Sequence, residues 1–132
     1  LSTVAPPTST QIGFTSDVFT DLLEIRYSSP LFRLGDAGLL QARLSYLDEE
    51  IPGLIAMRIT DSTGPDLDRG LEEVVVVFNA TAEEQSVDLP SGLGRLRLHP
   101  VQRSGGDPVV KAASASRSAL TVPARTVAVF VG

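Results

Sequence analysis

The spacing of the hydrophobic residues changes from a helical period to a strand period near Gly38. In the early run "SDVFTDLLEIRYSSPLFRLGD", apolar side chains recur three and four residues apart, as they do on one face of an α-helix. They form one stripe: Val18, Leu22 and Ile25, widened by Phe19 and Leu23. This pattern predicts one helix of about three turns over residues 17–29.

Residues at both ends of this run support the predicted helix limits. Ser16 is suited to the N-cap position, and Asp17 would place a negative charge beside the positive end of the helix dipole. Pro30 ends the helix, because the residue before a proline is disfavoured in the α region. The segment before the helix, residues 1–14, contains two adjacent prolines and several Ser and Thr residues. It is therefore predicted to be extended or mobile.

Downstream of this helix the hydrophobic pattern is that of short β-strands. In "GLIAMRITD", Ile55, Met57 and Ile59 alternate with other residues and would share one face of a strand. Four consecutive valines at 74–77 are unfavourable in a helix, and their uninterrupted run predicts a strand buried on both faces. The predicted strands occupy residues 39–47, 53–61, 71–80, 85–90, 94–101, 118–123 and 126–132.

Turn sequences separate the predicted strands at fairly regular intervals. They are "DSTGPD", "NATAEE", "LPSGLG", "RSGGDP" and "VPAR". Many short strands with turns at such intervals are typical of two packed antiparallel sheets. The predicted fold class is therefore all-β, an antiparallel β-sandwich of about seven or eight strands preceded by one N-terminal α-helix.

Length, composition and charge restrict the function classes. The 132 residues suit one domain, and the absence of Cys removes disulfides, thiol nucleophiles and thiolate metal sites. Acidic residues outnumber basic ones by 16 to 11 without long blocks, so no nucleic acid partner is predicted. No apolar run approaches the ~18 residues of a membrane span, and no membrane partner is predicted. The opening "LSTVAPPTST" lacks signal-peptide features and is expected to be a linker or a cut inside a longer chain.

The order of these segments resembles the C-terminal part of enzymes in the α-amylase superfamily. "LLEIRYSSPLFRLGD" is similar to the last helix of their catalytic (β/α)8 barrel and the Ser-Pro connector that follows it. "SSPLFRLGD" specifically resembles the pullulanase branch, the α-1,6-glucosidases that debranch starch-type glucans. "PGLIAMRITD", "VVVVFNAT" and "LTVPARTVAVFVG" look like the C-terminal β domain of that family, so the resemblance covers residues 16–132.

The resemblance implies an extended linker at 1–15, the last barrel helix with its connector at 16–36, and a C-terminal β-sandwich domain at 37–132. The implied function is that of a non-catalytic domain that packs on and stabilises the catalytic barrel of the same polypeptide. The parent would be a pullulanase-type enzyme hydrolysing α-1,6-glucosidic bonds in starch- or glycogen-type glucans. A secreted or cell-surface parent is favoured, although the residues leave the compartment open. Residues expected at the barrel interface are Val18, Leu22, Ile25, Arg26, Pro30, Leu31 and Phe32.

The carboxylates of this chain do not predict a catalytic site. Glycoside hydrolysis needs two carboxyl groups ~5–9.5 Å apart, one of them held protonated, and in the resembled family they lie on barrel loops. The adjacent acidic residues fall at turns or strand starts, where a solvated cluster is the better interpretation. They are Asp48-Glu49-Glu50, Glu72-Glu73 and Glu83-Glu84. No catalytic residue is assigned, and the chain is predicted not to be an enzyme by itself.

No cofactor is predicted, although one loop is partly similar to a calcium site. Residues 61–70, "DSTGPDLDRG", place Asp66, Asp68 and Gly70 at a suggestive spacing. An EF-hand loop needs at least about five oxygen ligands and a bidentate Glu at its last position, and here the next acidic residues come too early. A surface loop in which Asp68 caps a turn is the preferred interpretation, with calcium as the alternative.

Two isolated polar residues have simple structural interpretations. His99 is the only histidine and cannot form a zinc site without carboxylates, so it is interpreted as a polar residue at a strand end. Asn79-Ala80-Thr81 matches the N-glycosylation pattern. It is interpreted as a turn in which Asn79 tolerates special backbone angles.

Two other functions stay open: an α-glucan-binding module and an unrelated immunoglobulin-like interaction domain. Glucan-binding modules stack sugar rings on exposed aromatic side chains, Trp above all, and this chain has no Trp. Phe78 and Phe130 lie in strands predicted to be buried, and Phe19 lies on the helix stripe. The immunoglobulin-like alternative explains the strands but not the helix or "SSPLFRLGD". The candidate glycan platforms are Tyr27 and Tyr46, followed by Phe14 and Phe32.

Overall fold

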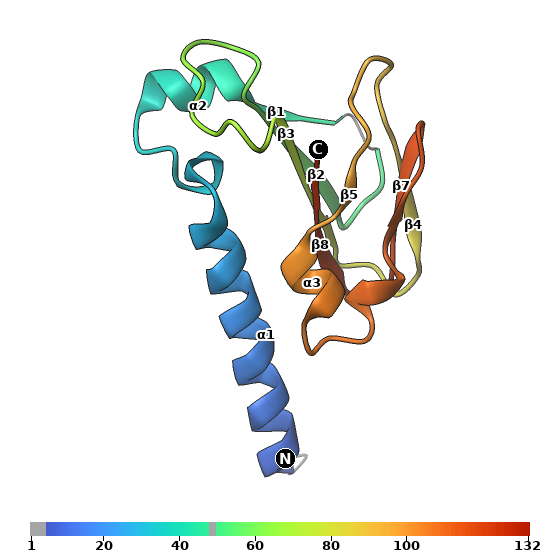
Figure 1. Ribbon diagram of the computed structural model, residues 1–132. Helices are drawn as coiled ribbons and strands as arrows, with labels where there is room; N and C mark the ends of the chain where they lie inside the picture. The colour runs from blue at the N-terminus through green and yellow to red at the C-terminus, as the bar shows by residue number, and fades with distance from the viewer. Residues whose placement is uncertain (1–4, 48–49) are drawn as a thin grey trace.

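The computed structural model describes residues 5–47 and 50–132, which form a long helix beside two β-sheets (Figure 1). The helices are α1 (Ser9–Ser28), α2 (Ala37–Arg43) and α3 (Pro100–Ser104), with 3-10 turns η1 (Pro30–Arg33) and η2 (Val110–Ala112). Sheet A contains β1 (Leu44–Tyr46), β2 (Leu54–Thr60), β3 (Glu73–Asn79), β8 (Thr126–Val131) and β5 (Arg97–Leu98), in that order. Sheet B contains β4 (Gln85–Asp88), β7 (Ala119–Val122) and β6 (Ser114–Ala115), in that order.

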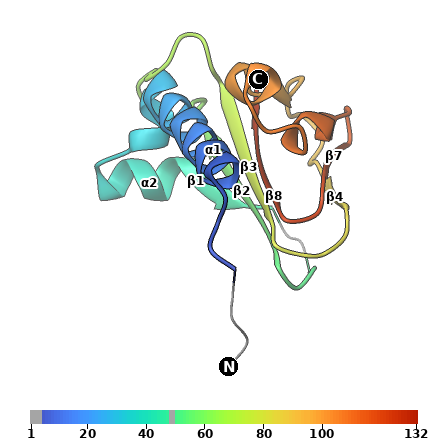
Figure 2. The same cartoon turned by 90° about the horizontal axis from the view of Figure 1, so that it is seen from below.

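The elements form three layers, with sheet A in the middle. Viewed from below, α1 lies on one side of sheet A and sheet B lies on the other (Figure 2). Every strand pair among the described residues is antiparallel. The eight strands of the described residues, with one long helix before them, confirm the predicted antiparallel sandwich.

Helix α1 begins earlier than predicted. The hydroxyl of Thr8 accepts a hydrogen bond from the Gln11 N–H at 3.2 Å, and Gln11 Oε1 accepts one from the Thr8 N–H at 2.8 Å. This reciprocal capping box satisfies two donors at the start of the helix. Residues 9–15, predicted to be extended, are therefore helical, and Ser16 is not the N-cap. Although α1 has 20 residues, none of the described helices is long and apolar enough to cross a membrane.

The prediction of a single strand over residues 39–47 is wrong. Asp36 caps α2, because its Oδ1 accepts a hydrogen bond from the Leu39 N–H at 3.0 Å. A good N-cap can determine the conformation of a short segment whose alternation of hydrophobic residues is weak. Only the three residues of β1 remain of the predicted strand.

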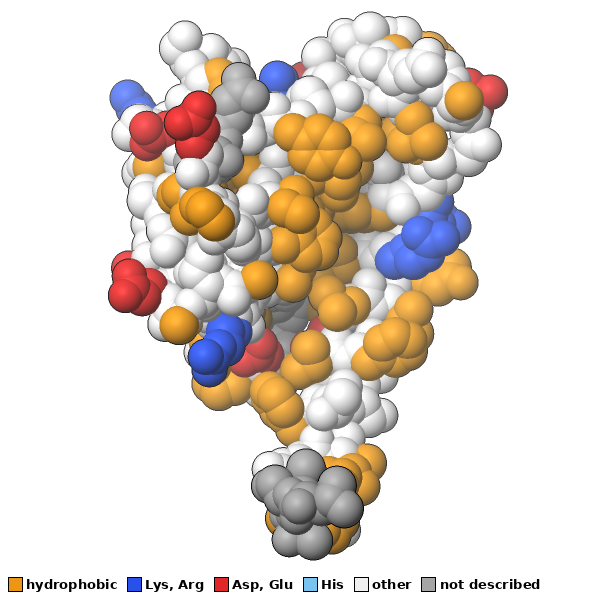
Figure 3. Space-filling model, turned by 180° about the vertical axis from the view of Figure 1, so that it is seen from behind, with side chains coloured by type: hydrophobic (Ala, Val, Ile, Leu, Met, Phe, Trp, Pro, Cys, Tyr) orange, Lys and Arg blue, Asp and Glu red, His pale blue; other side chains and the backbone are white. Residues whose placement is uncertain are grey.

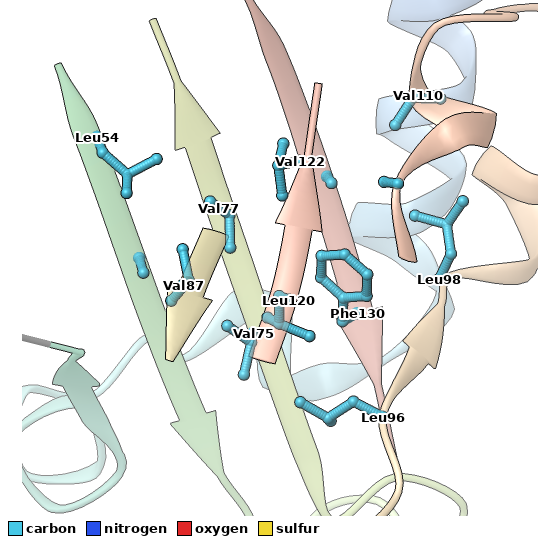
Figure 4. Packing of buried hydrophobic residues seen from close by; sticks show 13 residues of the cluster. Leu54, Val75, Val77, Val87, Leu96, Leu98, Val110, Leu120, Val122 and Phe130 are labelled. Atoms are coloured by element: carbon cyan, nitrogen blue, oxygen red, sulfur yellow. The ribbon is translucent and has the colours of Figure 1, made fainter. Parts of the chain in front are cut away.

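The space between the two sheets contains the larger hydrophobic core (Figure 4). Alternate side chains of β2, β3 and β8 point toward sheet B, as the period of a strand requires. Phe130 is fully buried at its centre, as predicted for its strand. Sheet A contributes Leu54, Ala56, Val75, Val77, Ala128 and Phe130, and sheet B contributes Val87, Leu120 and Val122.

The opposite face of sheet A packs against α1 and η1. Ile25 and Leu31 enter this second core beside Val74 and Val76. Because the other two valines of 74–77 belong to the larger core, the run is buried on both faces, which confirms its prediction. The two cores place sheet A between sheet B on one face and α1 with η1 on the other.

Several segments differ from the predicted strands. Of residues 94–101 only β5 is strand, because His99 caps α3 and Pro100 occupies its first turn. Residues 110–115, for which no element is predicted, form η2 and β6. Phe78, predicted to be buried, is exposed, because the elements that pack on the outer face of sheet A leave its position uncovered.

Candidate functional site

Helix α1 has a hydrophobic stripe that is wider than the part covered by the β domain. Ile25 is the one buried residue of the helix, and Val18, two turns earlier, is half-buried on the same side. Ile12, Phe19 and Leu23 lie roughly a third of a turn around the helix axis from them and are 58%, 62% and 39% exposed. Apolar side chains that extend this far around a helix are normally covered by more than one neighbouring element. We call Ile12, Phe19 and Leu23 the outer helix face.

A second uncovered apolar area lies on the outer side of sheet A. Ile55, Phe78 and Val127 are neighbours across β2, β3 and β8, and the first two are 54% and 40% exposed. The exposed Tyr46 lies opposite Met57 in the next row. Figure 3 shows hydrophobic side chains along the helix and across the neighbouring surface, with most charged side chains at the margins. Val127 also lines a groove beside α1, together with Val18 and Leu22 of the helix.

The connector after α1 fixes the helix to the β domain. Ser29 is fully buried, and its hydroxyl accepts a hydrogen bond from the Leu31 N–H at 3.2 Å at the start of η1. Arg26 Nη1 donates to the Phe32 carbonyl at 3.1 Å and so ties η1 back to α1. The direction of the helix relative to the sheets therefore depends on short-range hydrogen bonds as well as on the second core.

The predicted barrel-interface residues do not all lie on a free surface. Ile25 and Leu31 are buried inside this chain and cannot contact another domain. Phe32 is half-buried against the second core. Val18 and Leu22 line the groove beside α1, whereas Arg26 and Pro30 are exposed.

Sequence reasoning placed Phe19 and Leu23 on the hydrophobic stripe of the helix but missed Ile12, which falls outside the stripe when the helix is taken to begin at Ser16. It also missed the uncovered pair Ile55 and Phe78. The spacing of Ile12, Phe19 and Leu23 was the available signal.

A buried ion pair organises the loop after β2. The side chains of Arg43 and Asp61 are 0% and 4% exposed and form a salt bridge. Asp61 Oδ2 also accepts hydrogen bonds from the N–H groups of Leu67 and Asp68 at 2.9 and 2.8 Å. Burial raises the pKa of the Asp61 carboxyl, but these two amides and the guanidinium outweigh it and hold that pKa below its usual value. The Asp61 carboxylate is thus already fully engaged.

The same loop, residues 61–70, is the segment for which the sequence leaves a calcium site as an alternative. Asp68 Oδ1 accepts a hydrogen bond from the Gly70 N–H at 2.9 Å, which confirms that it caps a turn. In the described part of the chain, no three Asp, Glu or His side chains gather closely enough to hold a metal ion. Of the adjacent acidic residues, Asp48 and Glu49 lie outside the described residues.

Asn79 joins the two sheets through its side chain and is not at a backbone turn. Its Nδ2 lies 2.9, 3.1 and 2.9 Å from the carbonyl oxygens of Glu83, Val122 and Pro123. Its Oδ1 accepts hydrogen bonds from the N–H and the hydroxyl of Thr81 at 3.0 and 2.7 Å. The residue belongs to β3 with a negative φ, so the predicted special backbone angle is wrong. A buried amide with these partners is not accessible to a glycosylating enzyme in the folded chain.

The two candidate glycan platforms are exposed but belong to different elements. Tyr27 lies near the end of α1, and Tyr46 ends β1. The Arg33 guanidinium stands 5.3 Å from the centre of the Tyr27 ring, so one face of that ring is already occupied. Of the substitutes, Phe14 is exposed on α1 and Phe32 is half-buried.

Comparison with known proteins decides the family. The chain matches the family described as alpha-1,6-glucosidases, pullulanase-type, C-terminal, over residues 2–132. The chain belongs to this family. The pullulanase-type domain is 41% identical to Pullulanase 1, chloroplastic, of Arabidopsis thaliana, over 95% of this chain and 14% of that protein. It is 30% identical to pullulanase of Klebsiella pneumoniae, over 96% of this chain and 12% of that protein.

Solved pullulanase structures contain the same fold. Apo pullulanase from Klebsiella pneumoniae superposes with a TM-score of 0.88 at 30% identity, covering 98% of this chain and 15% of that one. The structure of that enzyme complexed with maltotriose gives a TM-score of 0.88 over 13% of its chain. The chain therefore corresponds to a small C-terminal portion of the pullulanases that it matches, and its described residues do not include a catalytic barrel. The resemblance seen in the sequence is confirmed.

Proposed function

We propose that this domain packs against the catalytic barrel of the same polypeptide and stabilises it. The parent enzyme would hydrolyse α-1,6-glucosidic bonds in starch- or glycogen-type glucans. The observation that carries the proposal is the outer helix face, where a large aromatic and two aliphatic side chains of an otherwise well-packed domain stand in solvent. Large exposed apolar patches on a folded domain usually mark a contact with another protein surface.

Membership of the family supports the barrel as the surface that would cover the outer helix face. The matched relatives are several times longer than this chain, and the sequence of α1 resembles the last helix of the barrel. A helix of that kind would be shared, with Ile25 and Val18 toward the β domain and the outer helix face toward the barrel. Each fully buried large apolar side chain contributes about 1.5–3 kcal/mol, so three such residues would form a substantial contact.

The double substitution Phe19→Ser and Leu23→Ser is expected to destabilise the full-length enzyme but not the isolated chain. In the full-length enzyme it should lower the melting temperature and loosen this domain, because two side chains buried against the barrel are lost, at a cost of about 3 kcal/mol or more. In the 132-residue chain alone it should leave the free energy of unfolding almost unchanged, because both side chains are exposed there. Differential scanning calorimetry of both proteins measures the difference.

Val109→Ser is the matched control, because Val109 is an exposed apolar residue outside α1 and outside the uncovered area of sheet A. It should leave the melting temperature of both proteins unchanged. The proposal is wrong if the double variant and the control behave alike in the full-length enzyme. A large loss of stability in the isolated chain would also contradict it, because that would assign the two side chains to this domain's own core.

Titration with maltooligosaccharides and a branched α-glucan tests the second candidate function. We expect no saturable amide shifts in NMR spectra at millimolar sugar, because Tyr27 has one ring face covered by Arg33 and pairs with no second aromatic ring among the described residues. The same titration is repeated with the variants Tyr46→Ala and Tyr27→Ala, each of which removes one candidate platform. Localised shifts that saturate, and that disappear in either variant, would assign glucan binding to the domain.

A further inference from the structure

His99 connects the helix and its connector to the β domain at a single buried position. The residue is 5% exposed, and its backbone N–H donates to the Val129 carbonyl of β8 at 2.8 Å. Its Nδ1 accepts a hydrogen bond from the Val101 N–H at 3.2 Å and so caps α3. Its Nε2 lies 3.2 Å from the hydroxyl oxygen of Ser28, the last residue of α1. One imidazole thus links α1, α3 and β8.

The hydrogen-bond partners of the ring determine its protonation state. The Ser28 hydroxyl donates its one hydrogen to the Ile25 carbonyl at 2.7 Å, so its oxygen accepts from His99 Nε2–H. The Val101 N–H needs an unprotonated Nδ1 as its acceptor. The Val101 contact therefore requires neutral imidazole with its hydrogen on Nε2, whereas Nε2–H can donate to Ser28 in either protonation state. A second proton on Nδ1 would point at the Val101 N–H, and two donors would face each other.

The surroundings of the ring offer no compensating charge. The Phe32 ring stands edge-on with its centroid 6.3 Å away, and β8 carries no charged residue. Burial of the ring lowers the pKa of His99 below its usual value. The charged side chains on the elements packed around it have other partners or are exposed without a bond to the ring. They are Asp21 at the Gly106 N–H, Arg26 at the Phe32 carbonyl, Arg33 over Tyr27, and the exposed Asp17, Glu24 and Arg103.

We propose that His99 is a pH-sensitive contact that holds the end of α1 and η1 on the β domain when it is neutral and releases them when it is protonated. Protonation removes the acceptor of the α3 cap at Nδ1 and leaves the Nε2–H bond to Ser28 possible. It also creates a cation in a buried position beside the edge of Phe32. Because a buried cation without a partner is costly, the ring would move toward water and take its contacts with α1 and η1 apart. This contact lies within the chain itself, so the proposal can be tested independently of whether the domain packs on a barrel. An effect on the barrel would follow only where the proposed function also holds.

NMR of the 132-residue chain tests the proposal without ambiguity of assignment, because the chain has one histidine. At pH 8 the imidazole nitrogens should show the Nε2–H tautomer. As the pH falls below about 6.5, the unfolded chain binds a proton that the folded chain does not yet bind, so stability decreases. When the folded His99 titrates, the amide protection factors of Ser28, Leu31 and Val101 should fall about fivefold to tenfold, the amount expected for the loss of one or two hydrogen bonds.

Two variants provide the controls. His99→Asn keeps a side-chain acceptor for the α3 cap but cannot titrate, so the protection factors should no longer change between pH 8 and pH 5. Ser28→Ala removes the acceptor of Nε2–H, and protection at the end of α1 should be low already at pH 8. A Nδ1–H tautomer, or titration of His99 with unchanged protection of α1 and η1, would overturn the proposal. If His99→Asn does not fold, these two wild-type measurements still decide it.

Discussion

Asp61→Ala is expected to lower the free energy of unfolding by about 3–5 kcal/mol, because it leaves the Arg43 guanidinium buried without its ion-pair partner. The Arg43 side chain is completely buried, and one of its nitrogens, Nε, already lacks a hydrogen-bond partner. The substitution also leaves the N–H groups of Leu67 and Asp68 without their acceptor. Denaturant unfolding followed by circular dichroism measures the loss.

Asp66→Ala is the control for this prediction, because Asp66 lies in the same loop but is exposed. Its effect should stay within about 0.5 kcal/mol, as for most surface positions. Equal losses in the two variants would show that the loop, and not the buried pair, determines the effect.

The pH dependence of the wild-type chain offers a second test of the same pair. Because the pKa of Asp61 is lower in the folded chain than in the unfolded chain, its contribution is complete above about pH 4 and is lost as the pH falls through the folded pKa. The stabilities of wild type and Asp61→Ala should therefore converge in acid. A difference that stays constant down to pH 2 would contradict this assignment.

Local patterns predicted the parts of the fold whose cause is local. The valines at 74–77 required a strand buried on both faces, and β3 lies between the two cores. The end of α1 followed from Pro30. The start of α1 was missed although Thr8 and Gln11 form a recognisable capping box, because Ser16 offered a competing N-cap closer to the hydrophobic stripe.

Tertiary contacts decided the remaining elements and most of the candidate site. Phe78 and Phe130 occupy similar strand positions, yet one is exposed and the other fully buried, because only one of them faces sheet B. No periodicity in the sequence indicates that the covering elements leave part of the outer face of sheet A open. His99 and Asn79 were interpreted as a strand end and a turn, since their partners are distant in sequence and become visible only in the fold.

Asn79→Ala is expected to cost about 3 kcal/mol, because it removes the donor of two buried carbonyl groups, those of Val122 and Pro123, at the point where the sheets meet. Asn79→Asp should be at least as destabilising at neutral pH, because a carboxylate would face the carbonyl oxygens that the amide now bonds. Its stability should rise as the pH is lowered enough to protonate that carboxyl group. Urea unfolding of the two variants at pH 7 and at lower pH measures both effects.

Thr81→Ala separates this bonding role from the glycosylation pattern that Asn79 and Thr81 share. It removes the pattern as completely as Asn79→Ala does, but it leaves the bonds of Asn79 to Val122 and Pro123 in place. Its cost should therefore be only about 1 kcal/mol, from the hydrogen bonds that close the turn after β3. Both variants should be measured in protein produced by a glycosylating host and in protein produced without glycosylation. If both variants lost the same stability in the first preparation and none in the second, a glycan would be the cause. If instead the Asn79 variants lost much more stability than Thr81→Ala in both preparations, Asn79 would be assigned to joining the two sheets. Its burial in β3 and its bonds to the carbonyl groups of Val122 and Pro123 require that role.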